Sequence, residues 1–353
     1  MSNTPYRYGI IGTGRPHNTA GATGFGMAHY HYPSFQATGK VELVAIADIE
    51  DDPAQFFLTK YESKAKHYTD YHAMLAQENL DLVSICTWPH LHAEMAVAAA
   101  EAGVKVIHCE KPMATTWGDC KRMKAAADAH GAKLSFGHQR RHIKLFQAVR
   151  QAAQEGAIGD LVMIEAEVGD MFDWGTHWLD MMQFYNNEAP IEWVIGQIDS
   201  RTERRIFGAF MENQAVCHFK WKNGVRGFLL AGYEAKIGAV HRLIGTEGVI
   251  EVLSERKYRI LGKGQGEWKE VEVPQGAQHD WMLASVDVVR QLEEPEHKSL
   301  LSVDYAIQHT EIIFATYYSS QTRQRVDFPL EYEGSALLDM LETGEVGPKR
   351  YGV

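Results

Sequence analysis

Three side chains that could move protons or stabilise charge lie in two motifs of the sequence. Lys111 belongs to Glu110-Lys111-Pro112, at the end of an apolar run, and Asp173 and His177 lie four residues apart in VGDMFDWGTHWLD. An imidazole titrates near neutral pH and suits a general base, whereas an ammonium can stabilise negative charge that develops on oxygen. Structural explanations compete: the lysine could be a surface charge, Asp173 could cap a helix that begins at Trp174, and His177 could pack in the core.

A third motif, GIIGTGRPHNTAGATGFG, includes the end of an apolar strand and begins like a dinucleotide-binding turn. Such a turn uses two glycines for a tight bend and for close approach of a pyrophosphate at a helix N-terminus, and a third small residue lets strand and helix pack closely. Gly12 and Gly14 supply the first two, but His17 occupies the third position. If Gly26 is the third small residue, the intervening segment is an insertion of about nine residues relative to the standard spacing.

The acid expected to bind the adenosine ribose supports this interpretation. Such an acid lies about 20 residues beyond the glycines, at the end of the second strand. Asp48 closes VELVAIAD and follows Gly26 by 22 residues. A cofactor with a 2′-phosphate would also meet Glu50, Asp51 and Asp52, and we expect no arginine there to receive it, so the sequence favours NAD over NADP.

Two patterns of hydrophobic residues divide the chain. From Tyr6 to about Gly137, short β-branched runs alternate with longer amphipathic ones, which predicts a parallel, doubly wound sheet. The predicted strands are YRYGIIG, VELVAIAD, DLVSICT, VKVIHCE and KLSFG, and LHAEMAVAAAEAG predicts a helix that ends at Gly103. Ligands bind at the carboxyl edge of such sheets, where Lys111 would lie.

After Gly137 the pattern changes to period-2 alternation and hairpins, which predicts an open, largely antiparallel sheet. Asn223-Gly224 marks a tight turn within QAVCHFKWKNGVRGFLLAGY. Further strands are predicted in DLVMIEAEV, HRLIGTEGVIEVL and KYRILGKGQGEWKEVEV, and helices in HIKLFQAVRQAAQEG, HDWMLASVDVVRQLEE and SVDYAIQHTEIIFATYYSSQ. The fold class is therefore α/β followed by α+β, with a boundary near residue 138.

Composition restricts the partners and the compartment. The 353 residues suffice for two domains, and a net charge of -11 argues against nucleic acid or an acidic membrane as partner. The four cysteines contain no C-x-x-C pair, which favours a reduced, cytoplasmic setting. An apolar strand follows the N-terminus too closely for a signal peptide, and no apolar run could span a bilayer. We expect a cytoplasmic protein with a small-molecule ligand.

Several segments together resemble the Gfo/Idh/MocA family, named after glucose-fructose oxidoreductase, inositol dehydrogenase and MocA. They are GIIGTG, VAIAD, TDYHAML, DLVSICTWPHLHAEMAVAAAEAGVKVIHCEKPMA, DWGTHWLD, NGVRG, IGTEGVIEV and VDFPL, which extend over nearly the whole chain. The resemblance implies an NAD-binding Rossmann domain at 1–137 and a substrate-binding and oligomerisation domain at 138–353. It also implies a homo-oligomer, a dimer or tetramer, and a cis peptide before Pro112.

The resemblance implies hydride transfer between NAD and a secondary hydroxyl or ketone of a sugar, cyclitol or related polyol, with Lys111, Asp173 and His177 as the catalytic group. A base removes the hydroxyl proton as the hydride leaves carbon. Either His177 or Lys111 could be that base. Two other functions fit the same family: an enzyme that retains NAD and cleaves glycosides by transient oxidation and elimination, and a non-catalytic NAD-sensing regulator.

The same resemblance implies a set of residues around the cofactor. Thr87-Trp88-Pro89 replaces the T-P-N of many relatives, so an aromatic ring could line the nicotinamide side of the pocket. The insertion could clamp the cofactor, form a wall of the substrate pocket or be a surface loop. His92 matches a position that caps the helix behind the cofactor. The implied contacts are Gly12, Thr13, Gly14, Phe25, Gly26, Asp48, Thr87, Trp88, Pro89, His92, Glu110, Lys111 and Gln139.

Histidine pairs raise the question of a metal. His90 and His92, and likewise His138 and His142, have spacings that metal ligands can adopt, but no carboxylate completes a set. We expect no metal.

Two arginines and three aromatic residues have open assignments. Arg140 and Arg141 could bind an anionic substrate or form a salt-bridged domain junction. Trp174, Trp178 and Tyr185 could stack on a sugar or lie in the core.

Overall fold

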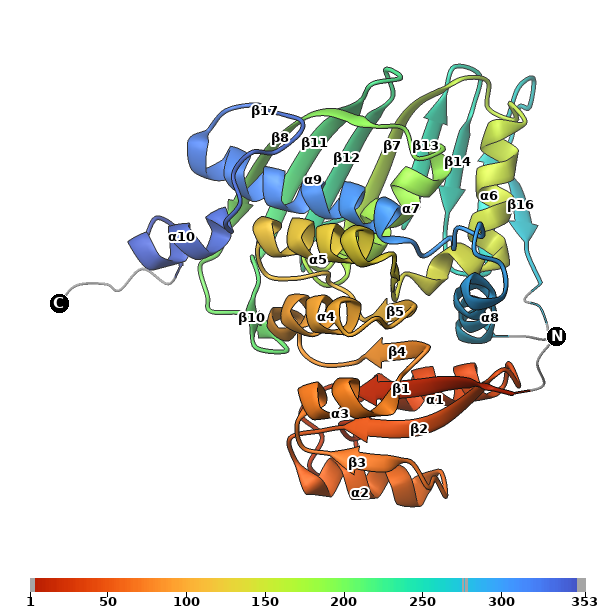
Figure 1. Ribbon diagram of the computed structural model, residues 1–353. Coiled ribbons are helices and arrows are strands. Elements are labelled where there is room, and N and C mark those ends of the chain that lie inside the picture. Colours follow the sequence, from red (N-terminus) through yellow and green to blue (C-terminus); the bar gives the residue numbers. More distant parts are fainter. Residues whose placement is uncertain (1–3, 275, 277–278, 348–353) are drawn as a thin grey trace.

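Residues 4–274, 276 and 279–347 are described in the computed structural model, which contains a parallel and a mixed sheet (Figure 1). The parallel sheet has the order β3-β2-β1-β4-β5-β6, which reverses direction between β1 and β4. Ligands of doubly wound sheets bind at such a switch point. Its strands are β1 (Tyr6–Ile11), β2 (Val41–Ala47), β3 (Lys66–Tyr68), β4 (Leu82–Ile85), β5 (Val106–Cys109) and β6 (Lys133–Phe136).

Helices cover both faces of the parallel sheet. Buried side chains of α1, α2 and α8 form one apolar cluster with it, and those of α3, α4 and α5 contribute to another. The sequence pattern predicted five of the six strands but missed β3, which has only three residues. The helices are α1 (Ala28–Gln36), α2 (Asp51–Lys60), α3 (Tyr71–Glu78), α4 (His92–Glu101), α5 (Trp117–His130) and α8 (Asp280–Glu293).

The second sheet has nine strands in the order β16-β15-β14-β13-β7-β12-β11-β8-β17. It is largely antiparallel, as predicted, but β7 and β12 pair in parallel. Asn223-Gly224 forms the predicted turn, with Gly224 at φ +92°. The strands are β7 (Leu161–Val168), β8 (Ile191–Asp199), β11 (Gln214–Trp221), β12 (Arg226–Gly232), β13 (His241–Gly245), β14 (Val249–Val252), β15 (Lys257–Leu261), β16 (Lys269–Glu272) and β17 (Val326–Asp327).

A short hairpin, β9 (Arg205–Ile206) and β10 (Ala209–Phe210), stands apart from both sheets. Two short 3₁₀ turns, Pro89–Leu91 and Gln139–His142, follow β4 and β6. The remaining helices are α6 (Lys144–Gln154), α7 (Gly175–Tyr185), α9 (Val303–Thr322) and α10 (Ala336–Thr343). Helix α9 crosses the second sheet beside α5 (Figure 1).

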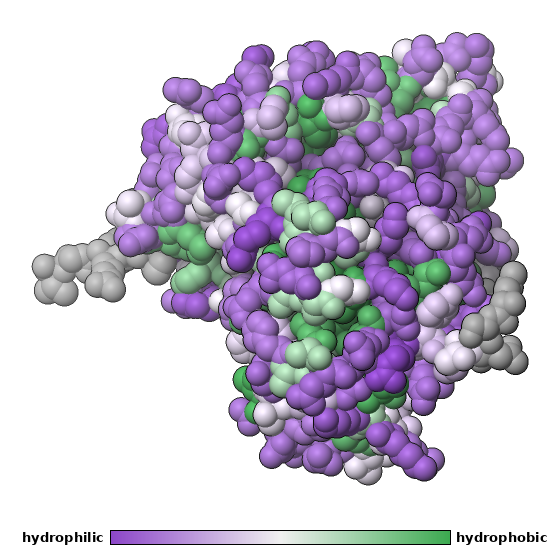
Figure 2. Space-filling model, in the orientation of Figure 1, coloured by the Kyte–Doolittle hydropathy of each residue, from purple (hydrophilic) through white to green (hydrophobic). Residues whose placement is uncertain are grey.

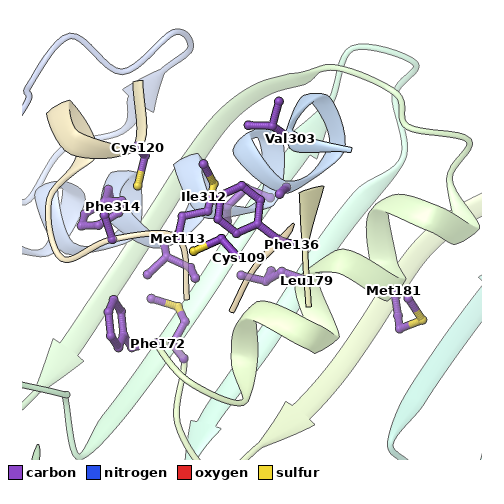
Figure 3. Packing of buried hydrophobic residues seen from close by; sticks show 14 of the residues in the cluster. Cys109, Met113, Cys120, Phe136, Phe172, Leu179, Met181, Val303, Ile312 and Phe314 are labelled. Atoms are coloured by element: carbon purple, nitrogen blue, oxygen red, sulfur yellow. The ribbon is translucent and has the colours of Figure 1, made fainter. Parts of the chain in front are cut away.

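One apolar core extends from the parallel sheet into the second sheet. Met113 and Phe136 of the first region belong to the same buried cluster as Phe172, Ile312 and Phe314 of the second (Figure 3). The two regions are therefore held together by side-chain packing, which favours a fixed relative placement.

Hydrophilic side chains predominate on the face of the molecule shown in Figure 2, with several groups of hydrophobic ones between them. Within the described ranges, no helix combines the length and apolar character needed to cross a bilayer.

Candidate active site

The glycine-rich segment forms a turn between β1 and α1. Gly12, Gly14 and Gly26 all have positive φ, at +83°, +55° and +65°. A Cβ atom on Gly14 would lie 3.5 Å from the Cα of Gly26, and one on Gly26 would lie 2.3 Å from the carbonyl oxygen of Arg15. The lack of room for a Cβ atom supports Gly26 as the third small residue. Residues 15–25 then hold the two residues of the standard spacing and the insertion of about nine, and we refer to this whole loop as the insertion.

The carboxylate of Asp48, just after β2, faces this turn. Its Oδ2 accepts hydrogen bonds from the amide and hydroxyl of Thr13, at 2.9 and 2.7 Å, and from the amide of Gly14 at 3.2 Å. A side chain at Gly12 would collide with Thr87, at 2.7 Å. A bend without Cβ atoms, an acid on the adjacent strand and a following helix together fit a dinucleotide.

An arginine lies beside the acidic residues that follow β2, contrary to our expectation. The guanidinium of Arg15 makes two hydrogen bonds to Asp52, at 2.7 and 2.9 Å, and lies over the ring of Phe56. The expectation was wrong because Arg15 belongs to the insertion, whose path the spacing did not reveal. Its charge is compensated by Asp52.

The insertion reaches the hairpin β9–β10 through aromatic contacts. The ring of Phe25 stacks on His17 and meets the ring of Phe207 edge-on, with centroids 5.7 Å apart. Trp88 lies between the two segments, because Cβ atoms on Gly24 and Gly208 would approach it to 3.8 and 3.1 Å. We call Phe25, Trp88 and Phe207 the aromatic bridge.

Lys111 and Asp173 meet across the two regions. Lys111 follows β5 and precedes Pro112 through a cis peptide bond. Its Nζ donates a hydrogen bond of 2.6 Å to Oδ1 of Asp173, whose side chain is buried. The surface-charge explanation of Lys111 is therefore wrong.

The turn before α7 presents Asp173. Oδ1 of Asp170 accepts hydrogen bonds from the amides of Asp173, at 2.7 Å, and Trp174, at 3.0 Å. Asp170 thus holds the turn before α7. The N-cap residue of α7 is Trp174, which makes no side-chain capping hydrogen bond, so the capping explanation of Asp173 is wrong. Asp173 also lies two residues before the helix rather than inside it.

His177 lies in the first turn of α7 and is buried. Its Nδ1 has no hydrogen-bond partner among the described residues. Burial, reinforced by the positive charges of Arg140 and Lys111, lowers the pKa of His177 well below its usual value. The imidazole is therefore neutral at physiological pH, the form that a general base requires, although the same surroundings make it a weaker base than an exposed histidine.

The 3₁₀ turn Gln139–His142 adds polar groups near these residues. Oε1 of Gln139 is buried without a partner in the described part of the chain. The guanidinium of Arg140 lies over the rings of Trp174 and Trp178, and its Nε is 3.3 Å from Glu255.

The three aromatic residues with open assignments differ in burial. Trp174 remains 45% exposed, whereas Trp178 donates a hydrogen bond to the carbonyl of Glu167, and Tyr185 is a core residue. Of the three, Trp174 offers the most open surface for stacking on a ligand.

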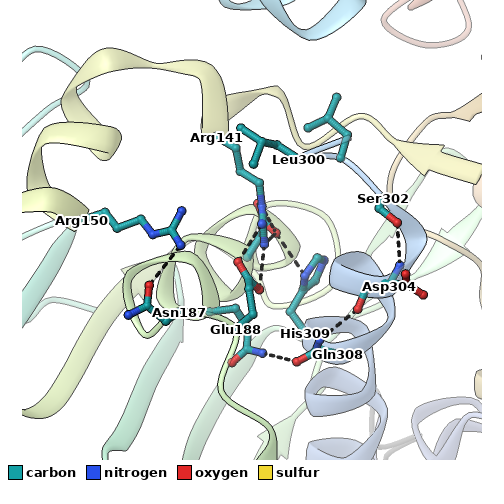
Figure 4. Close-up of polar contacts among 12 residues, drawn as sticks. Arg141, Arg150, Asn187, Glu188, Leu300, Ser302, Asp304, Gln308 and His309 are labelled. Carbon is teal, nitrogen blue, oxygen red and sulfur yellow. Dashed lines mark hydrogen bonds and ion pairs between the residues drawn. The ribbon is translucent and has the colours of Figure 1, made fainter. Parts of the chain in front are cut away.

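Arg141 forms the more deeply buried ion pairs of the two arginines. Its guanidinium is fully buried and binds Asp180 and Glu188, with shortest distances of 2.7 and 2.8 Å (Figure 4). The hydrogen-bonding capacity of Arg141 is used inside the protein, so this arginine serves packing.

Two histidines near the glycine-rich turn differ from the sequence analysis: the role of His31 was not predicted, and that of His92 was predicted wrongly. Nε2 of His31, in α1, lies 2.7 Å from the carboxylate of Glu110. Although burial opposes ionisation, this hydrogen bond keeps the pKa of Glu110 below its usual value. His92 does not cap a helix amide; its ring nitrogens contact the carbonyls of Thr87 and Pro112.

The remaining histidine pair is used within the protein. Nε2 of His138 lies 3.0 Å from the hydroxyl of Thr176 and 3.2 Å from Nε2 of His309. His142 contacts Asp287 at 3.5 Å. Throughout the described ranges, no three histidine, cysteine or acidic side chains are grouped as metal ligands would be.

The parallel sheet, its switch point and the glycine-rich turn define a dinucleotide-binding Rossmann domain. Residues 6–138 match the model of the Gfo/Idh/MocA oxidoreductase family, NAD-binding Rossmann fold. This match covers the parallel-sheet region and ends before the second sheet begins.

Curated relatives match part of the chain. Inositol 2-dehydrogenase from Salmonella paratyphi B is 36% identical over 184 residues, which cover 51% of this chain and 52% of the relative. The corresponding enzyme from Pseudomonas syringae pv. syringae is 31% identical over 159 residues, 45% of this chain and 44% of the relative. The chain thus spans about half the length of the curated relatives that it matches.

Solved structures match the fold over both regions. Levoglucosan dehydrogenase, in complex with NADH and levoglucosan, has a TM-score of 0.78 at 19% identity and covers 93% of this chain and 100% of that one. An oxidoreductase from Agrobacterium radiobacter, in complex with NAD+, L-tartaric acid and magnesium, has a TM-score of 0.75 at 18% identity, with 92% and 98% coverage. At these identities the likeness concerns the fold.

Proposed function

We propose that the protein is an NAD-dependent dehydrogenase or reductase that acts on a secondary hydroxyl or ketone of a sugar, cyclitol or related polyol. The observation that carries this proposal is the 2.6 Å contact between Lys111 and Asp173, which joins the carboxyl edge of the parallel sheet to the turn before α7. His177 follows on that helix with a free ring nitrogen within the described structure. The names of the inositol and levoglucosan dehydrogenases support the substrate class.

The proposed roles follow from charge and burial. His177, neutral through burial, accepts the hydroxyl proton when an alcohol is oxidised. Lys111 stabilises negative charge on the reacting oxygen, and Asp173 fixes the direction of the ammonium. Bound NAD supplies the hydride acceptor at its nicotinamide ring. Gly12, Gly14 and Asp48 would hold the pyrophosphate and ribose.

Absorbance of reduced nicotinamide tests the proposal directly. Purified protein is mixed with NAD and a panel of inositols, aldoses and anhydrosugars, and NAD binding is measured in parallel. We expect turnover on at least one member. The absence of turnover on every member, together with the absence of NAD binding, overturns the proposal.

A second candidate is favoured by the aromatic bridge, which connects the insertion to the hairpin β9–β10. An enzyme that cleaves glycosides by transient oxidation, elimination and re-reduction must keep its NAD bound throughout, and a connection of this kind could hold the cofactor in place. Cofactor that survives purification, together with glycoside release without net NADH, would support this function. A third candidate is a non-catalytic NAD sensor. It would be supported if a K111A variant kept every measurable activity of the protein.

The remaining sequence-based expectations stay predictions. They are a domain division at residue 138, a homo-oligomeric state and a cytoplasmic location.

A further inference from the structure

A buried glutamate lies behind the turn that carries Asp173. Glu212, in the loop between β10 and β11, has no exposed surface. Its Oε1 accepts a hydrogen bond of 2.5 Å from the amide of Met171, and its Oε2 accepts one of 2.7 Å from the hydroxyl of Tyr317 in α9. The glutamate therefore ties the turn before α7 to a long helix that packs on the second sheet.

This contact continues directly to the proposed catalytic group. Met171 follows Asp170, whose carboxylate accepts the amides of Asp173 and Trp174. Two carboxylates thus fix three amides of a five-residue turn. Asp173 projects from this turn to Lys111.

Keeping two carboxylates here is electrostatically costly. Glu212 and Asp170 are both buried. Burial, followed by the charge of Asp173, raises the pKa of Asp170, and burial, followed by the charge of Asp170, raises the pKa of Glu212. Arg204 compensates the charge of Asp170 only weakly, because its Nη2 lies 3.8 Å from that carboxylate. A buried like-charge pair is expensive, and such pairs cluster at functional sites.

We infer that Glu212 is a positioning residue for the proposed hydride transfer: in its ionised form it holds the amide of Met171 and thereby keeps Asp173 against Lys111. This inference rests on the proposed function. Ionised Glu212 accepts hydrogen bonds with both oxygens. A proton on the carboxyl group would turn one oxygen into a donor and weaken its hold on Met171 or Tyr317.

The charge of Glu212 should change near physiological pH. Burial, followed by the charge of Asp170, raises the pKa of Glu212 to about 7, whereas the hydroxyl of Tyr317 opposes this rise. Asp170 and Tyr317 are the titratable side chains that act on this carboxyl group, and Arg204 reaches only the backbone carbonyl of Glu212, at 3.5 Å. The turn should therefore be held more firmly above pH 7 than below it.

The first test is the pH dependence of turnover by the full-length protein. E212Q keeps the shape and an acceptor for Met171 but cannot ionise. We expect kcat to fall about tenfold, since small misplacement of a reacting group is costly, with little change in KM. The pH profile of kcat should lose its rise near pH 7. Unchanged kcat and an unchanged rise in E212Q would overturn the inference.

Two further variants separate positioning from general structure. Y317F removes a hydrogen bond that lowers the pKa of Glu212, so the rise should move to higher pH. E311Q is the matched control. Glu311, on α9, is a partly buried glutamate that, like Glu212, accepts a hydrogen bond from a backbone amide; the donor is Leu330, at 2.6 Å. E311Q should leave the rise in place. A rise that stays put in Y317F, or that disappears in E311Q, contradicts the inference.

Fluorescence keeps this inference distinct from the proposed function. Trp174 lies in the turn. Its emission is obtained by subtracting the fluorescence of W174F from that of the wild type, and it is measured as a function of pH without substrate. We expect a transition near pH 7 that E212Q lacks; its presence in E212Q overturns the inference. Absence of turnover by wild type counts against the proposed function, whereas turnover with an unaltered profile in E212Q counts against the role of Glu212 alone.

Discussion

Lys111 and Asp173 lie 62 residues apart in the chain, and their side chains meet at 2.6 Å. The contact joins the segment after β5 to the turn before α7, so both regions of the protein contribute to one charged pair. Because Asp173 is buried, loss of its partner would leave an unpaired carboxylate in a low-dielectric setting.

Replacement of Lys111 should impair turnover much more than cofactor binding. In K111M we expect kcat/KM to fall by about 10²–10³-fold, because the charge that stabilises the reacting oxygen is lost. The affinity for NADH, measured by fluorescence titration, should change little, since the glycine-rich turn is intact. K121M is the control, because Lys121 forms an exposed ion pair with Glu333. Near-normal kcat/KM in K111M would contradict the assignment.

The pairing of Arg15 with Asp52 suggests how cofactor preference could be altered. In D52N the guanidinium loses its charged partner and becomes free to meet a 2′-phosphate. We expect the affinity for NADPH to rise on the order of tenfold relative to NADH, as a charge-assisted hydrogen bond allows.

The control for this change is D51N, because Asp51 is exposed and does not contact Arg15. The double variant R15Q/D52N should lose the gain. A gain that persists without the arginine would show that Arg15 is not responsible.

Truncation of the aromatic bridge should speed release of the cofactor. F207A removes the ring that meets Phe25 across the two regions. Stopped-flow displacement of NADH should show a dissociation rate several-fold higher, because one edge-on aromatic contact contributes about 1 kcal/mol.

W268A is the matched control for F207A. Trp268 lies over Arg259 and is also partly exposed. Equal dissociation rates in F207A and wild type would assign the insertion to a surface loop.

His241 should make the folded state sensitive to acid. Burial, and secondarily the charge of Arg140, lowers the pKa of His241 to about 3. Neither ring nitrogen has a partner among the described residues. In the unfolded chain His241 is protonated below about pH 6.5, whereas in the folded chain it is protonated only below about pH 3. Between these two values the unfolded state binds more protons, so the free energy of unfolding rises with pH.

H241L removes this dependence. Between pH 7.5 and 5, the free energy of unfolding in urea should fall by about 2 kcal/mol less in the variant than in wild type. H130Q, at an exposed histidine, is the control. An identical loss in H241L and wild type would contradict the prediction.

Periodicity in the sequence predicted most of the fold. Period-2 runs and turn residues located seven of the nine strands of the second sheet, because each strand buries one face, but the prediction missed β8 and β17. The three residues of β3 carry too little pattern for such a prediction, and the two-residue strands of β9–β10 carry none.

The site was harder to predict from the sequence. Resemblance drew attention to Lys111, Asp173 and His177, yet nothing local showed that the side chain of Asp170 holds the turn before α7. His31 and Glu212 act through contacts with residues 79 and 41 positions away, respectively. Such contacts depend on the tertiary arrangement, which a local pattern does not specify.

The adjacency of Gly14 and Gly26 has a consequence for loop length. Residues 15–25 leave and rejoin the backbone path at nearly one point, so a shorter or longer excursion needs no adjustment of β1 or α1. The length of the insertion can therefore change without a change in the geometry of the glycine-rich turn. A search with a rigid glycine spacing would reject this chain, although its bend keeps all three glycines in place.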